Sequence, residues 1–168
     1  MKISVRQITF TAMLTAITTA LCTVKIPLGF ANLYLVDVAV CLAGLLLNPF
    51  LAFIAGGAGA FLGDLLFYPQ AMMVTLITRA VQVVVISIFA HYVKPKKTLV
   101  PAIIGCIIGV IIMVAGYCFF AILFYSSIEY AFTKMPFEAL QAVVGVIIAL
   151  PLCFKFRLRE ILENYMEK

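Results

Sequence analysis

Two charged side chains, Asp64 and Arg79, lie within the long apolar stretch GAFLGDLLFYPQAMMVTLITRA (residues 59–80). At the centre of a membrane helix a charge costs roughly 2.5–3.5 kcal/mol unless it meets a partner or a polar cavity. Two interpretations follow from this cost. Asp64 and Arg79 could form a structural ion pair across a helical hairpin, or they could belong to a polar cavity that binds a ligand.

Other polar and aromatic residues lie near the same ends of the apolar segments and favour the cavity. Asn32, Tyr34 and Asp37 begin the second segment. Glu138 and Gln141 are three residues apart, so they share a helix face at the start of the last segment. Carboxylates and amides recognise ring N–H and hydroxyl groups, and aromatic rings stack on flat heterocycles. The predicted binding residues are Asn32, Asp64, Tyr68, Thr75, Arg79, Tyr117, Tyr125, Glu138 and Gln141, and the predicted ligand is small, polar and aromatic.

We expect different roles for these residues. Arg79 is the expected polar anchor, and Asp64 either orients Arg79 or contacts the ligand. Glu138 and Gln141 are expected to read the polar edge of the ligand. The expected stacking rings are Tyr68, Tyr117 and Tyr125.

The composition predicts the elements that carry these residues. The 168 residues are 65% hydrophobic and 11% charged, with a mean hydropathy of +1.20. A water-soluble domain of this length needs more polar surface, so most of the chain is expected to lie in lipid. A membrane helix needs about 20 apolar residues. The sequence therefore predicts one all-α transmembrane domain over 1–168, with six helices at 7–25, 33–48, 50–67, 71–93, 99–125 and 137–155, and its longest external loop at 126–136.

The basic residues predict the orientation in the membrane, because Lys and Arg mark cytoplasmic ends. Six crossings place both termini on one side. Nine basic residues then lie on that side, namely Lys2, Arg6, Lys94, Lys96, Lys97, Lys155, Arg157, Arg159 and Lys168. The opposite side carries only Lys25 and Lys134, so both termini are expected to be cytoplasmic. This topology also explains the net charge of +5, and no nucleic-acid partner is expected.

The residue types needed for catalysis or metal binding are sparse. The chain has one His, no CxxC pair and no Gly-Lys-Ser/Thr phosphate-binding loop. The five cysteines, at 22, 41, 106, 118 and 153, lie scattered in apolar runs and are expected to be small core residues. We therefore expect no catalytic residue, no metal, no cofactor and no ATP hydrolysis by this chain.

A stripe of small residues runs along the first predicted helix. Ala12, Ala16 and Ala20 recur every four residues and therefore share one face. Small residues at this spacing allow another helix to approach closely. The stripe could pack inside the bundle, or it could be offered to a partner protein.

Three stretches of the sequence resemble the S components of energy-coupling factor (ECF) vitamin transporters. They are ITFTAMLTAITTAL, NLYLVDVAVCLAGLLLNPFLAFIAGGAGAFLGDLLFYPQAMMVTLITRAVQ and MPFEALQAVVGVIIAL, and the resemblance that they carry covers nearly the whole chain. The central block is the most specific of the three and is most similar to the branch that handles hydroxymethylpyrimidine and pyridoxine-type vitamers. Related members usually have Lys at the position of Arg79 and Asn at that of Glu138, so riboflavin, pantothenate and queuosine precursors also stay open.

The resemblance implies a multi-pass subunit of the bacterial cell membrane that captures a water-soluble vitamin at its outer face. It implies assembly with a membrane T component, through Ala12, Ala16 and Ala20, and with two cytoplasmic ATPases. It also implies release of the vitamin inside the cell after the subunit topples in the membrane. The alternative is a small homodimeric secondary transporter or channel, for which a titrating carboxylate near mid-membrane would be expected. An intramembrane enzyme is disfavoured by the missing clusters of catalytic residues.

Overall fold

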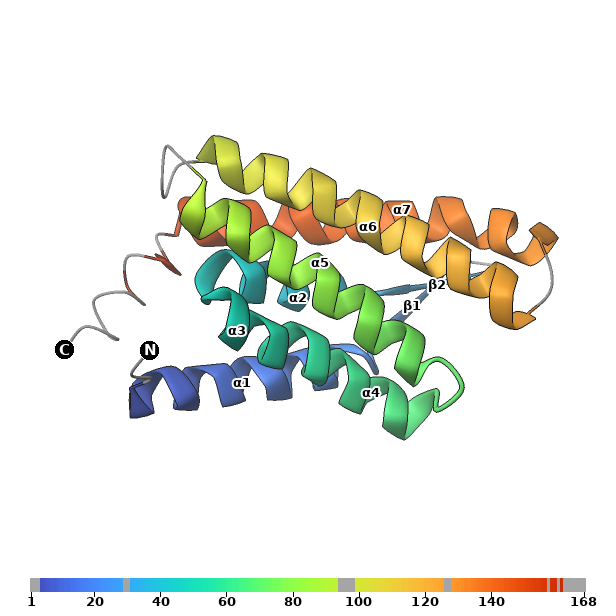
Figure 1. Ribbon diagram of the computed structural model, residues 1–168, viewed down its shortest axis with the longest axis horizontal. Coiled ribbons are helices and arrows are strands. Elements are labelled where there is room, and N and C mark those ends of the chain that lie inside the picture. The colour runs from blue at the N-terminus through green and yellow to red at the C-terminus, as the bar shows by residue number, and fades with distance from the viewer. Residues whose placement is uncertain are drawn as a thin grey trace.

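The computed structural model describes residues 4–28, 31–93, 99–125, 128–156, 158–159 and 161. Long helices run side by side, and a small antiparallel hairpin lies at one end of the bundle (Figure 1). The elements are α1 (Val5–Leu21), β1 (Lys25–Leu28), β2 (Ala31–Tyr34), α2 (Val36–Leu46), α3 (Pro49–Ala52), α4 (Gly59–Phe67), α5 (Met72–Tyr92), α6 (Leu99–Tyr125) and α7 (Ile128–Phe154). A π-helical segment, Phe53–Ala58, joins α3 to α4, so that Pro49–Phe67 forms one continuous helix.

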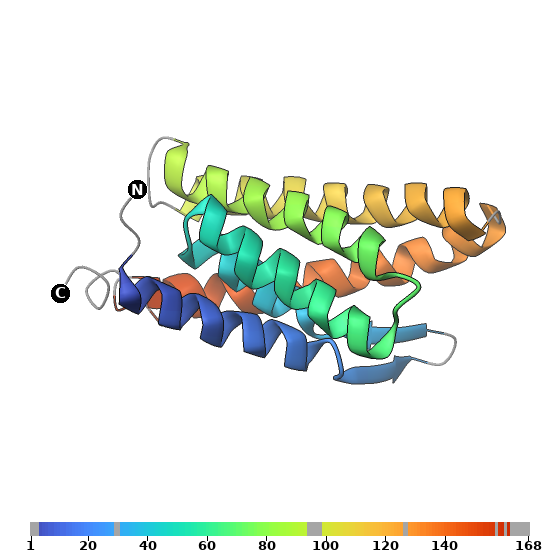
Figure 2. The same ribbon diagram turned by 60° about the horizontal axis from the view of Figure 1, so that its bottom comes forward.

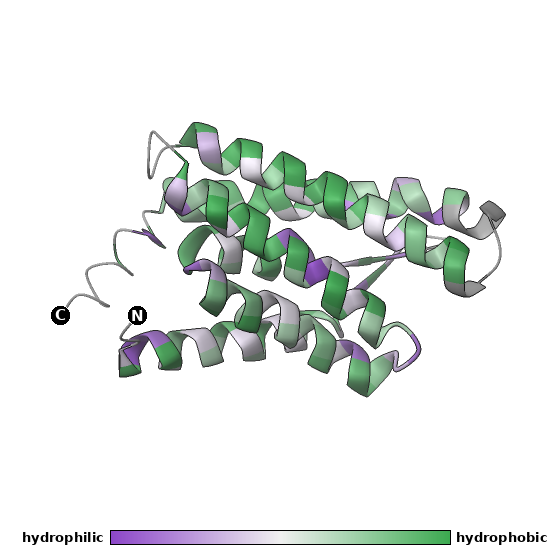
Figure 3. Ribbon diagram, in the orientation of Figure 1, coloured by the Kyte–Doolittle hydropathy of each residue, from purple (hydrophilic) through white to green (hydrophobic). Residues whose placement is uncertain are grey.

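The short helix α2 lies in the middle of the bundle, where it packs against α1, α5 and α7. Nine of its eleven residues are buried. Figure 2 shows α1 and α4 on one side of the bundle and α6 on the other. Hydrophobic residues cover most of the helices, and hydrophilic residues gather at the ends and at one place within α5 (Figure 3). The apolar exterior matches a lipid environment.

Four of the six predicted segments form helices that are long and apolar enough to cross a membrane. They are Pro49–Phe67, Met72–Tyr92, Leu99–Leu123 and Phe132–Phe154, among the residues that the structure describes. The helix α1 has 17 residues and α2 has 11. At 1.5 Å per residue α2 is only about 16 Å long, and it is tolerated because protein rather than lipid surrounds it. The helical fold class is thus confirmed, and six crossings stay a prediction.

Two boundaries differ from the prediction. Residues 25–28 and 31–34 form the hairpin of β1 and β2, with Lys25 opposite Tyr34 and Pro27 opposite Asn32, so neither predicted helix extends into this region. The predicted loop at 126–136 is helical from Ile128 onward. Phe132, Met135 and Ala139 follow a helical spacing and face α6. Packing of this apolar face on α6 stabilises the helical conformation on the N-terminal side of Pro136.

Glycines allow the helix Pro49–Phe67 to pack closely on two neighbours. A Cβ atom at Gly56 would lie 2.9 Å from Val83 Cγ2 of α5, and one at Gly59 would lie 2.9 Å from Thr18 Cβ of α1. The close approach to α1 also lets Thr19 Oγ1 donate a hydrogen bond of 2.9 Å to the Gly59 carbonyl. Small residues with hydroxyl bridges of this kind stabilise helix pairs in membranes. The packing fixes the end of α4, which carries Asp64.

Candidate functional site

A polar cavity of about 270 Å³ lies at the end of the bundle that is opposite the start of α1 and the end of α7. Residues of the hairpin, α2, α4, α5, α6 and α7 contribute to its wall. Figures 1 and 2 show how these elements are arranged in the bundle. Its lining residues are Cys22, Tyr34, Val36, Ala60, Asp64, Tyr68, Ala71, Thr75, Arg79, Tyr117, Lys134, Glu138 and Gln141. Charged, amide, hydroxyl and aromatic groups therefore converge in one cavity at this end of the bundle.

Arg79 lies at the inner wall of this cavity and is only 2% exposed. Its Nη1 donates to Asp37 Oδ1, and its Nη2 donates to Asp37 Oδ2 over 3.2 Å. Nη1 also donates to Gln82 Oε1 over 3.0 Å, one turn farther along α5. Of the two alternatives, the ion pair between Asp64 and Arg79 is therefore not formed, and Asp37 takes that place. Asp37 is fully buried, and α2 delivers it to Arg79 from the centre of the bundle.

Gln141 completes the network around Asp37. Its Nε2 donates to Asp37 Oδ2, and its Oε1 accepts a hydrogen bond of 3.1 Å from the backbone N–H of Tyr34. Gly145, one turn along α7, leaves room for Asp37, because a Cβ atom there would meet the Asp37 backbone carbon at 2.9 Å. Both ends of the Gln141 amide are thus engaged in holding α2, α7 and the hairpin together.

Asp64 belongs to a separate chain of hydrogen bonds near the N-terminus of α5. Thr75 Oγ1 donates to Asp64 Oδ2, and the same hydroxyl lies 3.0 Å from the Tyr117 hydroxyl. Among the described residues nothing donates to the other oxygen of Asp64. The chain joins α4, α5 and α6 on one wall of the cavity.

Three tyrosine rings shape the outer part of the cavity. Tyr34 and Tyr68 meet edge to face, with ring centroids 6.3 Å apart. Lys25 Nζ lies 4.5 Å from the centroid of Tyr68 and donates to its hydroxyl, which ties the hairpin to the turn after α4. The guanidinium carbon of Arg79 lies 5.5 Å from the centroid of Tyr117. Burial raises the pKa of the Tyr34 phenol above its ordinary value, so that this group stays neutral and can donate.

Glu138 faces the cavity from α7 and is half-buried. Within the described part of the chain, no residue hydrogen-bonds to its carboxylate. Lys134, one turn earlier, lines the exposed rim of the same cavity. Glu138 is therefore the acceptor that the protein leaves most available in this cavity.

Seven of the nine predicted binding residues line the cavity, namely Asp64, Tyr68, Thr75, Arg79, Tyr117, Glu138 and Gln141. Asn32 does not, because it lies exposed on β2 and not at the start of a helix. The side chain of Tyr125 falls outside the described residues. Tyr34 and Cys22 also line the cavity, although neither is among the predicted binding residues. Asn32 and Tyr34 are two residues apart on β2, so the period of a strand does not distinguish them.

The alanine stripe of α1 points away from the bundle. Ala12, Ala16 and Ala20 are exposed, whereas Leu14 and Thr18 on the other face are buried. Packing of the stripe inside the bundle is therefore excluded for this chain. Docking of a partner on this face stays a prediction.

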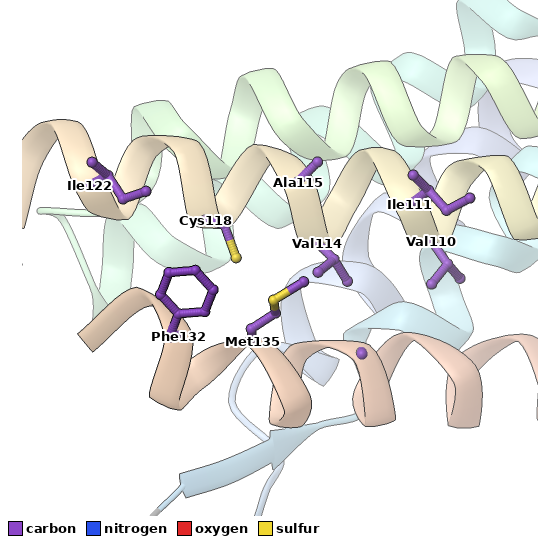
Figure 4. Close-up of a pocket in the computed structure, with 9 residues that line it drawn as sticks. Val110, Ile111, Val114, Ala115, Cys118, Ile122, Phe132 and Met135 are labelled. Atoms are coloured by element: carbon purple, nitrogen blue, oxygen red, sulfur yellow. The ribbon is translucent and has the colours of Figure 1, made fainter. Parts of the chain in front are cut away.

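A second cavity, the apolar groove of about 450 Å³, lies between α6 and α7 (Figure 4). Its lining residues are Val110, Ile111, Val114, Ala115, Cys118, Ile122, Phe132, Met135 and Ala139. The groove has almost no group that could orient a polar ligand. The polar cavity, although smaller, is therefore the candidate binding site, since such sites combine apolar walls with a few convergent polar groups.

Comparisons with known proteins agree with this architecture. Residues 2–157 match the family described as ECF-type riboflavin transporter, S component. A Pyrococcus woesei protein described as "Uncharacterized protein in gap 3'region" is 30% identical over 149 residues, which are 88% of this chain and 98% of that protein. The fold is similar to a solved structure described as "Structure and mechanism of the S component of a bacterial ECF transporter", with a TM-score of 0.66, 21% identity and coverage of 96% of this chain and 98% of that one. The chain therefore belongs to the family of ECF-type riboflavin transporter S components.

Proposed function

We propose that this subunit captures a small, water-soluble heterocyclic vitamin or vitamin precursor in its polar cavity. The observation that carries the proposal is the convergence of Asp64, Glu138 and three tyrosine rings at one end of an apolar bundle. Carboxylates bind N–H and O–H groups, and the rings can stack on a flat ligand. Membership of a transport family fits a role in binding rather than in catalysis.

The size of the cavity favours a ligand with a single ring. At about 270 Å³ it lies just below the range of roughly 300–1,000 Å³ that is usual for drug-sized ligands. A hydroxymethylpyrimidine or a vitamin B6 vitamer fits this size better than a three-ring flavin with its side chain. Riboflavin is the second candidate, because the family description names it. Pantothenate and queuosine precursors complete the set of candidates.

The orientation and the partners are part of the same proposal. With both termini in the cytoplasm, as the basic residues predict, the cavity opens toward the outside. The exposed stripe of Ala12, Ala16 and Ala20 then serves as the docking face for a T component, which carries the two ATPases. The vitamin reaches the cytoplasm when the subunit topples within this assembly.

Thermal unfolding of the purified chain in detergent tests the capture function. A ligand that binds only the folded state raises its stability by about 2.7 kcal/mol at 100 times the Kd. For a chain of this length we expect one compound among the B vitamins and their precursors to raise the midpoint by about 5–10 °C. Folded protein that responds to none of the named candidates would contradict the proposal. Uptake by the chain alone, in vesicles without ATPases, would instead support a secondary transporter.

A further inference from the structure

The polar groups that the protein leaves available in its cavity are mostly hydrogen-bond acceptors. Glu138 has no partner among the described residues, and one oxygen of Asp64 is also left over. An ionised carboxylate accepts hydrogen bonds and cannot donate them. A ligand that leaves these oxygens unpaired on binding loses the hydrogen bonds that they made to water, and binding is weakened accordingly.

Several donors of the wall, by contrast, are already engaged by the protein, although Arg79 Nε has no partner among the described residues. The Arg79 guanidinium donates to Asp37 and Gln82, and the Gln141 amide donates to Asp37. The Thr75 hydroxyl donates to Asp64. A ligand that offers only acceptors would therefore find few available donors in the described wall, namely Arg79 Nε and the Tyr34 hydroxyl, and would otherwise compete with bonds that hold the bundle together.

The charges of the cavity point in the same direction. Asp37 neutralises Arg79 through two hydrogen bonds, so the inner wall keeps the negative charges of Asp64 and Glu138. The balancing cations, Lys134 on the rim and Lys25 on the outer side of Tyr68, are both exposed, and solvent screens them. Tyrosine faces also attract cations rather than anions.

We propose that the cavity selects a neutral or positively charged heterocycle rich in N–H or O–H donors and rejects anionic counterparts, with Glu138 as the specificity-determining residue. The inference rests on the proposed capture function and narrows its substrate class. It removes pantothenate, a carboxylate, and any phosphorylated vitamin from the candidates. It also reverses the role expected for Arg79, which becomes a positioning residue that holds Asp37 and the floor of the cavity.

Matched ligands that differ in one substituent test the selectivity. Pyridoxamine, pyridoxine and 4-pyridoxic acid carry a cationic, a neutral and an anionic group on the same ring. Riboflavin and its 5'-phosphate form a second pair for a flavin-binding protein. Kd values are measured by titration calorimetry with the full chain in detergent. We expect the anionic member to bind about tenfold or more weakly than its neutral or cationic counterpart, because like charges in a partly buried site repel.

Two variants on the same helix provide the matched comparison. Glu138→Gln keeps the shape and removes the charge, so the ratio between anionic and neutral ligand should shrink by about fivefold or more. Lys134→Gln, one turn earlier, should leave that ratio unreduced. Equal or tighter binding of the anionic ligand, or an unchanged ratio in Glu138→Gln, would overturn the inference while leaving capture intact. If folded protein binds none of the five compounds, the inference and the B6 and flavin candidates both fail.

Discussion

Arg79 of α5 and Asp37 of α2 form a two-point ion pair in the interior of the bundle, and both residues are almost completely buried. The pair fastens a helix too short to cross the membrane to one that is long enough. Gln141 adds α7 and the hairpin to the same point. The charges are tolerated at this depth because each one neutralises the other, and because the amides of Gln82 and Gln141 add further hydrogen bonds.

Breaking this pair should destabilise the protein more than it changes ligand contacts. Asp37→Asn and Arg79→Met each leave one buried charge unpaired, which costs about 3–5 kcal/mol. The midpoint of thermal unfolding in detergent should fall accordingly, by about 2–4 °C per kcal/mol for a chain of this length. The double variant Asp37→Leu/Arg79→Met buries no charge and should regain part of the loss. Single variants as stable as the parent chain would contradict a structural role for the pair.

The glycine at position 59 should be required for the contact between α1 and α4. In Gly59→Ala the new methyl group would lie 2.9 Å from Thr18 Cβ and 3.0 Å from the Thr15 carbonyl. Overpacking of this kind costs about 1–3 kcal/mol, whereas replacing glycine by alanine gains about 1 kcal/mol of helix propensity. The substitution therefore destabilises the protein when the cost of overpacking lies in the upper part of its range. Leu62→Ala, on the exposed face of the same helix, is the control and should shift the unfolding midpoint little.

How far the sequence predicts the site is clearest from Arg79. Its location in a polar cavity and the convergence of Asp64, Thr75, Tyr117 and Glu138 could be predicted, because each residue lies near the same end of an apolar segment. Its partner could not. Several carboxylates lie near that end, and the choice of Asp37 depends on the insertion of α2 between α5 and α7. The pairing is thus a tertiary property that no local pattern encodes.

The hairpin escaped prediction for a related reason. Lys25–Leu28 and Ala31–Tyr34 are short and apolar enough to continue the flanking helices, and only their pairing with each other distinguishes them. Periodicity alone does not separate a short strand from a helix end. The sequence therefore predicts that Asn32 stands at the start of the second helix and in the binding site, whereas Tyr34 is the residue of β2 that lines the cavity.

The exposed alanines of α1 provide a test of partner docking. In Ala16→Leu the larger side chain should block close approach of a partner helix, so that the chain no longer copurifies with a coexpressed T component. Ligand affinity and thermal stability should stay as in the parent chain, because Ala16 faces away from the bundle. Ala115→Leu, an equally small exposed residue on α6, is the control. Normal assembly of Ala16→Leu would exclude this face as the docking surface.

Tyr117 should contribute to ligand binding through both its ring and its hydroxyl group. Tyr117→Phe removes the hydrogen bond to Thr75, which is worth about 0.5–1.5 kcal/mol. The affinity for the ligand should therefore fall by up to about tenfold. Tyr117→Leu also removes the aromatic face and should weaken binding further. Calorimetric titration of the ligand found by thermal shift gives both values. Equal affinities in the Phe and Leu variants would show that the ring does not contact the ligand.

The π-helical segment Phe53–Ala58 sets the rotational phase between the two halves of its helix. In a regular α-helix Gly56 and Gly63, seven residues apart, would share a face. Here Gly56 meets Val83 of α5, and Gly63 meets Cys22 after α1. Deleting one residue from this segment would restore the regular pitch and turn α4 by about 100°. Asp64 would then leave the cavity, although no side chain that lines it had been changed, so the acidic wall depends on a backbone irregularity almost two turns away.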